Sequence, residues 1–326
     1  MKVLITGSSG FIGGFLAAYC ANAGSSVLGI DIKEPTAASS GSFERCDVRD
    51  FDRLSKLISE FGPERIFHLA AQSCPTTSLV EPQKTIESNV VGTVNLFESL
   101  RALELRPIVV VACSSAEYGP IAPEDLPVRE THPLHPSHPY GVSKVAQDLL
   151  ALQYFTNDSI PAIRLRIFKT TGPGKLGEVC SDLARRAVEI EMGIRPPVMP
   201  VGNLTSHRSI VDVRDLVGAL GSSADYCTPG EVYNVGGSNN YSVQELIEAI
   251  RAQVSVFFTV NQRPELMRLV DEPVTTGNNS KFEACTGWHP KIPLDITLRD
   301  IMSWWRTRLN QSVEMQQPRG LATVQQ

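Results

Sequence analysis

The sequence lacks any uninterrupted apolar stretch of the ~20 residues that a membrane-spanning helix requires, and it lacks a surplus of basic residues. Its 326 residues include 30 Lys and Arg against 35 Asp and Glu, a formal net charge of -5. This balance provides no basic field for nucleic acid or an anionic membrane, so we expect neither as a partner. At 20% charged and 42% hydrophobic residues, the chain is too apolar to be disordered. We expect a soluble globular protein of one large domain or two interlocked ones.

Recognisable cysteine and histidine motifs are also missing. Seven cysteines are scattered without a C-x-x-C pair, which predicts reduced thiols in a cytoplasmic protein, most of them packed in the core. Three grouped histidines, at positions 132, 135 and 138, alternate with prolines and predict an extended surface loop, so no metal site is expected. The N-terminal apolar run breaks at Gly7, which argues against a signal peptide.

What is present is an alternation of strand and helix patterns through the first half of the chain. Apolar runs at 2–6, 26–30, 65–70, 107–113 and 162–168 predict strands, and helical spacing recurs at 11–23, 50–61, 87–103 and 140–155. Such alternation predicts an α/β fold with a parallel sheet covered by helices on both faces.

The alternation of strand and helix patterns ends after Thr171. Beyond it, helices are expected at 179–192, at 242–254 and around 295–309, with a shorter helix between the first two. We therefore predict a first domain at 1–170 with return segments at about 207–236, a smaller domain at 171–310, and a mobile tail at 311–326.

A glycine-rich turn joins the first predicted strand to the first predicted helix. Gly7, Gly10 and Gly13 permit a tight turn and close backbone approach, and the helix N-terminus offers N–H groups to a pyrophosphate. Asp31 ends the second strand, where a carboxylate can accept hydrogen bonds from ribose hydroxyls. It also disfavours a 2′-phosphate, so NAD is expected as the cofactor; nearby Lys33 weakens that argument and leaves NADP open.

A second constellation predicts proton transfer. Tyr140 and Lys144 lie four residues apart on one helix face, where the ammonium can lower the cost of forming phenolate. A tyrosine placed in this way serves as a general acid or base for a sugar hydroxyl or ketone. Ser114 follows a buried strand, at the carboxyl edge of the sheet where ligands bind.

These residues carry a resemblance to a known family. The segments TGSSGFIG (6–13), HLAAQS (68–73), SSAEYG (114–119) and PYGVSK (139–144) resemble the extended short-chain dehydrogenase/reductases, which bind NAD(P) on a Rossmann-type doubly wound sheet and act on nucleotide-activated sugars. The resemblance implies a catalytic triad of Ser114, Tyr140 and Lys144, and a homodimer. It also implies cofactor contacts at Phe11, Ile12, Asp47, Val48, Ala70, Ala71, Gln72 and Asn89, besides the glycines, Asp31, Tyr140 and Lys144.

The second half narrows the resemblance to GDP-4-keto-6-deoxy-mannose reductases and GDP-mannose 4,6-dehydratases, carried by TGPG (171–174), HRSIVDVRD (207–215) and GEVYNVG (230–236). It implies a C-terminal substrate-binding domain that clamps a nucleotide-diphosphate sugar. The substrate contacts it implies are Ser115, Glu117, Lys169, Arg185, Arg208 and Arg268, with the arginines suited to a diphosphate.

Three departures leave the reaction open. A 4,6-dehydratase has an acid two residues after the triad serine, where this chain has Ala116. The reductase pattern has Asn-His before TGPG and Ser before Pro-Tyr, where this chain has Lys169-Thr170 and His138. The leading hypothesis is a reductase of a GDP-4-keto-6-deoxy-hexose. The alternatives are a redox-neutral epimerase or dehydratase that retains NAD, and a non-catalytic NAD sensor.

Overall fold

The chain folds into two compact units in the computed structural model, which describes residues 1–35, 40–267 and 276–316. The first unit comprises Met1–Thr170, His207–Asn240 and Glu272–Ile292, and the second comprises Thr171–Ser206, Tyr241–Asp271 and Pro293–Gln326.

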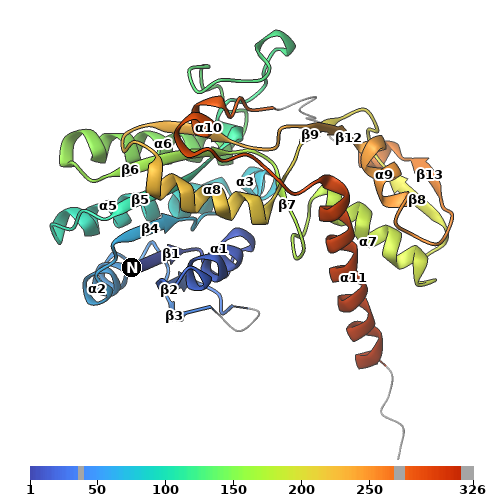
Figure 1. Cartoon of the computed structure of the whole chain (residues 1–326), viewed down its shortest axis with the longest axis horizontal. Helices are drawn as coiled ribbons and strands as arrows, with labels where there is room; N and C mark the ends of the chain where they lie inside the picture. The colour runs from blue at the N-terminus through green and yellow to red at the C-terminus, as the bar shows by residue number, and fades with distance from the viewer. Residues whose placement is uncertain (36–39, 268–275, 317–326) are drawn as a thin grey trace, which may run out of the picture. The chain divides into compact units, whose positions relative to one another are not determined.

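A parallel seven-stranded sheet forms the centre of the first unit, in the order β11-β6-β5-β4-β1-β2-β3 (Figure 1). Every pairing between neighbouring strands is parallel. The strands are β1 (Lys2–Thr6), β2 (Ser26–Asp31), β3 (Ser42–Arg45), β4 (Arg65–His68), β5 (Ile108–Ser114), β6 (Ala162–Ile167) and β11 (Val232–Val235). From β1 the chain proceeds to β2 and β3 on one side and to β4, β5 and β6 on the other. This reversal of strand order opens a crevice at the carboxyl ends of β1 and β4, where ligands bind in such sheets.

The remaining elements of the first unit flank this sheet. The helices are α1 (Phe11–Asn22), α2 (Phe51–Phe61), α3 (Pro75–Val80), α4 (Pro82–Ile86), α5 (Gly92–Ala102), α6 (Pro139–Asp158), α8 (Val213–Tyr226) and α10 (Ser280–Thr286). A π-helical turn η1 (Glu87–Val91), two 3₁₀ turns η2 (Ser115–Glu117) and η3 (Pro123–Asp125), and the short strands β9 (His207–Ser209) and β10 (Val211–Asp212) complete it.

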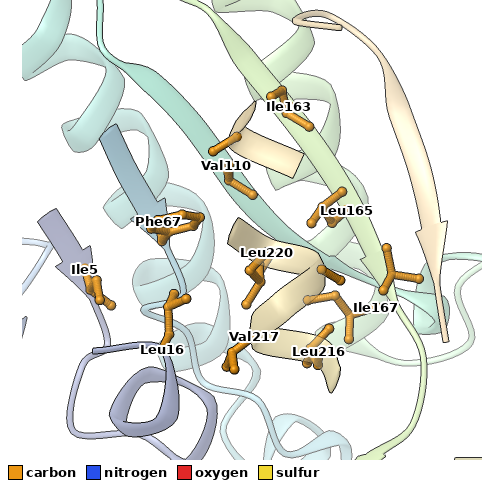
Figure 2. Close-up of a cluster of buried hydrophobic side chains, with 14 of the residues drawn as sticks. Ile5, Leu16, Phe67, Val110, Ile163, Leu165, Ile167, Leu216, Val217 and Leu220 are labelled. Carbon is orange, nitrogen blue, oxygen red and sulfur yellow. The ribbon is translucent and has the colours of Figure 1, made fainter. Parts of the chain in front are cut away.

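Two hydrophobic cores cover the two faces of the sheet, because successive side chains of a strand point to opposite faces. Val3 and Ile5 of β1 pack with α1 and α8, whereas Leu4 packs with α2, α5 and α6. Figure 2 shows the first core, in which Leu16 of α1 and Leu220 of α8 face the strand residues. Alternation along near-continuous apolar strands thus produces the predicted doubly wound arrangement.

Local signals define both ends of α2. The carboxylate of Asp50 accepts the N–H of Arg53 and caps α2, and Gly62 ends that helix in the left-handed conformation, with φ of 60°.

Smaller elements make up the second unit. Its elements are α7 (Val179–Glu191), β8 (Val198–Val201), α9 (Val243–Arg251), β13 (Thr259–Gln262), the 3₁₀ turn η4 (Pro264–Leu266) and α11 (Leu294–Gln316). β8 and β13 pair in parallel, and α7 packs against α9 and α11. The short strands β7 (Thr170–Thr171) and β12 (Asn240–Ser242) stand where the chain passes between units.

Two of the expected boundaries are wrong. Residues 276–292, placed by the sequence in the second domain, belong to the first unit, because Phe282 of α10 is fully buried in the α1–α8 core. The last helix continues to Gln316, whereas the sequence predicts a tail from residue 311. Residues 317–326 lie outside the described part of the chain.

Candidate active site

The glycine turn after β1 requires glycine at two positions. Gly7 has φ of 74°, and a Cβ there would stand 2.8 Å from the backbone nitrogen of Ala70, at the end of β4. A Cβ on Gly13 would stand 2.2 Å from the carbonyl oxygen of Gly7. The turn therefore packs tightly against the segment that follows β4, at the carboxyl ends of β1 and β4 where such sheets bind ligands.

The N-terminus of α1 fits a pyrophosphate. Gly10 is its N-cap, no side chain caps the helix, and no acidic residue stands in its first turn. The backbone N–H groups of a helix N-terminus and the positive end of the helix dipole attract an anion in this arrangement. In the same turn, the hydroxyl of Ser8 is buried and has no hydrogen-bond partner among the described residues.

Asp31 connects the end of β2 to this turn. Its Oδ2 accepts the N–H of Ser9 at 3.1 Å and its Oδ1 accepts the N–H of Lys33 at 3.1 Å. Each carboxylate oxygen has a second lone pair, so the fixed carboxylate can still accept from ribose hydroxyls. The dinucleotide site predicted from Gly7, Gly10, Gly13 and Asp31 thus has residues that fit NAD(P).

The loop after β4 is tied to α6 by Asn89. Its Oδ1 accepts the N–H of Gln72 at 2.7 Å, and its Nδ2 donates to the carbonyl of Gln72 at 3.0 Å and to Ser143 Oγ at 2.8 Å. Asn89 is fully buried and lies in the π-helical turn η1, a distortion that is frequent at functional sites. It therefore fixes the loop that carries Gln72 and links that loop to α6.

Asp47 and Val48 are engaged with their own neighbours. The Arg49 side chain hydrogen-bonds the Asp47 carboxylate and holds its pKa below the usual value. Val48 is buried against Gly92, where a Cβ would meet its Cγ2 at 2.5 Å. The predicted contact of this pair with the cofactor stays a prediction, as do the contacts of Phe11, Ile12 and Ala71.

The three predicted catalytic residues converge at the carboxyl edge of the sheet. Ser114 is the last residue of β5, and its side chain hydrogen-bonds the phenol of Tyr140 from the first turn of α6. The Nζ of Lys144 lies 5.8 Å from the centroid of the Tyr140 ring and donates to the carbonyl of Ala112 at 2.8 Å. The exposed fractions of Ser114, Tyr140 and Lys144 are only 8%, 9% and 3%.

Burial dominates the protonation of this group. It raises the pKa of Tyr140 to about 12, although the hydrogen bond from Ser114 acts in the opposite direction. It lowers the pKa of Lys144 to about 8. In the protein alone, desolvation is the largest influence on the Tyr140 phenol and the Lys144 ammonium donates to a backbone carbonyl, so the expected help of Lys144 in forming phenolate stays a prediction. Tyr140 holds its proton at neutral pH, as a proton donor must.

Glu117 differs from its predicted role as a substrate contact. Its side chain is fully buried; Oε1 accepts the N–H of Ser114 at 2.7 Å, and Oε2 pairs with Arg166 Nε at 3.1 Å. The segment is the 3₁₀ turn η2, with Ser114 and Glu117 forming a capping box. Glu117 consequently holds the backbone of Ser114 and does not face a substrate.

A buried ionic network continues from Glu117. Arg166 Nε also pairs with Asp148 Oδ2 at 2.9 Å, and Asp148 Oδ1 pairs with Arg164 at 2.5 Å. Asp148 follows Tyr140 and Lys144 at four-residue spacing on α6. Burial and the neighbouring Asp148 raise the pKa of Glu117 to about 8. Sequence reasoning missed Asp148 and Arg166, although the helical spacing of Asp148 was a usable signal.

The basic side chains that are predicted to contact the substrate lie in different surroundings. Lys169 is exposed just after β6, and Arg208 donates to the carbonyl of His207 in β9. In the second unit, Arg185 pairs with Glu189 at 3.0 Å and lies over the Trp305 ring. Arg268 falls outside the described residues. Ser115 begins η2 beside Ser114 and is half-buried.

His138 stands where the reductase pattern has a serine before Pro-Tyr, and it caps the helix that follows. It is the N-cap of α6, and its Nδ1 accepts the N–H of Gly141 at 3.0 Å. Its ring stacks near the Tyr140 ring, with centroids 6.0 Å apart. The substitution therefore keeps the cap that places Tyr140.

Comparisons with known proteins identify the family of the chain. The family model described as GDP-mannose 4,6 dehydratase matches residues 4–301. This chain belongs to that family. The GDP-6-deoxy-D-mannose reductase of Pseudomonas aeruginosa is 29% identical over 311 residues, covering 95% of this chain and 99% of the relative. The predicted membership of the extended short-chain dehydrogenase/reductases is confirmed.

Two solved structures share the fold. RMD from Pseudomonas aeruginosa complexed with NADPH has a TM-score of 0.84 at 29% identity, covering 94% of this chain and 99% of that chain. UDP-glucose 4-epimerase of Thermus thermophilus complexed with NAD has a TM-score of 0.83 at 27% identity, with 94% and 99% coverage. The predicted Rossmann-type doubly wound sheet is confirmed. Within the described residues, no helix is both long and apolar enough to cross a membrane.

Proposed function

We propose that this protein is an NAD(P)-dependent oxidoreductase that reduces the 4-keto group of a nucleotide-activated hexose, with a GDP-4-keto-6-deoxy-hexose as substrate. The observation that carries the proposal is the buried Tyr140 phenol, protonated and hydrogen-bonded to Ser114, at the same sheet edge as the glycine turn. Proton donor and dinucleotide site thus share one crevice.

The residues of this chain divide the work of carbonyl reduction. Bound NAD(P)H supplies the hydride. The hydroxyls of Ser114 and Tyr140 both donate hydrogen bonds to the carbonyl oxygen, where negative charge develops. Tyr140 then transfers its proton to that oxygen. The buried cation of Lys144, close to the Tyr140 ring, stabilises the phenolate that remains.

The nature of the substrate rests on the relatives. The reductase of Pseudomonas aeruginosa is named for a GDP-6-deoxy sugar, and the chain aligns with 99% of its length. We assign Arg185, Arg208 and Arg268 to the diphosphate, since guanidinium groups bind phosphate oxygens in bidentate fashion, and we assign Lys169 to it as a single point charge. Ser115 is assigned to the sugar beside the catalytic Ser114.

Reduction is favoured over 4,6-dehydration by one feature of η2. Dehydration needs an acid that exchanges the proton at C5 of the sugar, and Ala116 stands at the position where the dehydratases carry it. The neighbouring Glu117 has both oxygens engaged, by Ser114 and Arg166, and cannot replace it. The chain thus keeps the groups for hydride and proton transfer and lacks the group for elimination.

A redox-neutral epimerase is the second candidate. The observation that favours it is Asp31, whose carboxylate suits the free ribose of NAD, the cofactor in the Thermus thermophilus epimerase structure. Such an enzyme keeps its NAD, whereas a reductase exchanges NAD(P)H at every turnover. A non-catalytic sensor is disfavoured by the complete triad.

The experiment measures how much dinucleotide the purified protein retains and whether the substrate causes oxidation of added NADH or NADPH. Purified protein is dialysed, denatured and assayed for released dinucleotide; it is separately mixed with NADH or NADPH and a GDP-4-keto-6-deoxy-hexose. The proposal expects little retained dinucleotide and substrate-dependent loss of absorbance at the NADH wavelength. Stoichiometric retained NAD with interconversion of sugar epimers would support the epimerase instead.

We further infer a cytoplasmic homodimer. The assembly is supported by apolar side chains exposed on α6, Val142 and Leu149, together with Val91 of η1. Sedimentation equilibrium of the purified chain tests it, with twice the 35.6 kDa chain mass as the expected result.

A further inference from the structure

Two cysteines that the catalytic site does not use lie against each other in the first unit. The Sγ atoms of Cys227 and Cys285 are 3.2 Å apart, although 58 residues separate them along the chain. Cys227 is the C-cap of α8, and Cys285 lies in α10. Nothing in the cysteine spacing of the sequence indicates this pair.

The backbone around both cysteines is fixed by packing. The N–H of Cys227 donates to the carbonyl of Ser223 at 3.0 Å. Cys285 lies in the same helix as Phe282, three residues after it, and Phe282 is fully buried. The Phe282 ring meets the rings of Tyr233 and Trp288 edge-on, with centroids 6.0 and 5.5 Å away. The two sulfur atoms are therefore held as neighbours by the core and do not meet by chance at mobile ends.

The two thiols differ in access. Cys227 is 8% exposed, whereas Cys285 is half-buried on a short surface helix. A small reagent thus reaches Cys285 first, and Cys227 is positioned behind it as the resolving thiol. Burial, together with the hydrogen bond to Cys285, raises the pKa of Cys227, so the isolated Cys227 thiol is a poor nucleophile until its neighbour is modified.

We propose that Cys227 and Cys285 are a redox modification site that forms a reversible intrachain disulfide by exchange with a small-molecule disulfide such as glutathione disulfide. The Cys285 thiolate attacks one sulfur of that disulfide, which breaks the S–S bond and releases one thiol. The Cys227 thiolate then attacks Cys285 Sγ and releases the second thiol. Two protein thiols are oxidised and one disulfide is reduced to two thiols, so electrons and protons balance.

The crosslink would fasten α10 to the end of α8. The sulfur atoms need to approach by roughly 1 Å more to bond, a movement within the reach of side-chain rotation. Because α10 packs on β11 and α8, the bond joins elements that already touch. It should raise the melting temperature by several degrees by restricting the unfolded chain.

The test treats the full chain with glutathione disulfide and maps the products by mass spectrometry. Two of the seven thiols should disappear into a crosslink between the peptides of Cys227 and Cys285, and dithiothreitol should restore them. The exposed Cys74 should carry glutathione and so shows that the reagent is active. Cys20→Ser, which removes another buried thiol, is the matched control and should leave the crosslink intact.

Single variants separate the two roles. Cys227→Ser should leave glutathione trapped on Cys285, and Cys285→Ser should leave Cys227 unmodified. The oxidant should raise the melting temperature of the wild type and of neither variant. The proposal is overturned if Cys74 reacts while Cys227 and Cys285 stay reduced, or if the wild type accumulates glutathione on Cys285 without a crosslink.

Discussion

The backbone N–H of Ser114 donates to Glu117 Oε1 at 2.7 Å, inside a buried capping box. The other oxygen of that carboxylate pairs with Arg166, which also pairs with Asp148 of α6. One ionic network therefore holds the strand that carries Ser114 and the helix that carries Tyr140. We regard Glu117 as a positioning residue that acts through Ser114.

The first prediction concerns this positioning. Glu117→Ala should lower kcat by roughly tenfold or more, because it removes the acceptor of the Ser114 N–H and the partner of the charged Arg166, and a hydrogen bond to a charged group contributes about 1.5–3 kcal/mol. KM should change little, since Glu117 does not face the substrate. Glu117→Gln keeps an acceptor for the Ser114 N–H and should recover part of kcat. Glu124→Gln, at an exposed glutamate, is the control. Equal losses in both Glu117 variants with a matching rise in KM would contradict the role.

The second prediction concerns stability against pH. The pKa of Glu117 is raised from the ordinary 4.5 to about 8, chiefly by burial, so the folded chain binds a proton more tightly there than the unfolded chain. Its contribution to stability is complete below pH 4.5 and is lost as the pH rises through about 8. Melting temperatures of the wild type should therefore fall across that window. Those of Glu117→Gln should fall less steeply, and parallel curves would refute the assignment.

A third prediction tests the glycine turn with two adjacent residues. A Cβ on Gly13 would stand 2.2 Å from the Gly7 carbonyl oxygen, whereas one on Gly14 would meet nothing closer than the carbonyl oxygen of Ser8 at 3.9 Å. Gly13→Ala should displace the turn and weaken NADH binding by at least about tenfold, or 1.4 kcal/mol. Gly14→Ala should bind NADH as the wild type does. Fluorescence titration measures both, and equal affinities would argue against a cofactor at this turn.

Cofactor choice supplies the fourth prediction. The Asp31 carboxylate is fixed by the N–H groups of Ser9 and Lys33, and its charge opposes a 2′-phosphate. Asp31→Asn removes the charge and keeps the size. The ratio of kcat/KM for NADPH to that for NADH should rise by about tenfold or more, given about 1.5–3 kcal/mol for a charged hydrogen bond. An unchanged ratio would mean that a residue other than Asp31, for example Lys33, determines the preference between NADH and NADPH.

Sequence and structure agree where the determinants are local. The glycine turn, the acid at the end of β2 and the four-residue spacing of Tyr140 and Lys144 are properties of short segments, so pattern alone predicts them. The near-continuous apolar strands likewise predict a sheet buried on both faces. The sequence did not predict the edge strand β3, because three of its four residues are polar and exposed and only Phe43 is apolar and half-buried.

The features that the sequence did not predict depend on contacts between residues that lie far apart along the chain. Arg166 meets Glu117 across 49 residues and Cys285 meets Cys227 across 58, and no short-range pattern encodes either distance. One signal was present: Ser114-x-x-Glu117 has the capping-box spacing, which predicts that the glutamate turns back to the backbone. The prediction of Glu117 as a substrate contact did not take this capping-box spacing into account.

The most direct test of the account follows the transferred hydride in the presence of Tyr140 and in its absence. A GDP-4-keto-6-deoxy-hexose is incubated with NADH or NADPH deuterated at C4 of the nicotinamide, and the sugar product is examined by NMR. The account predicts one deuterium at C4 of the hexose, formed by the wild type and slowed by about 10²–10⁴-fold in Tyr140→Phe, which should still bind NADH. A deuterium-free product, or turnover by Tyr140→Phe at the wild-type rate, would contradict it.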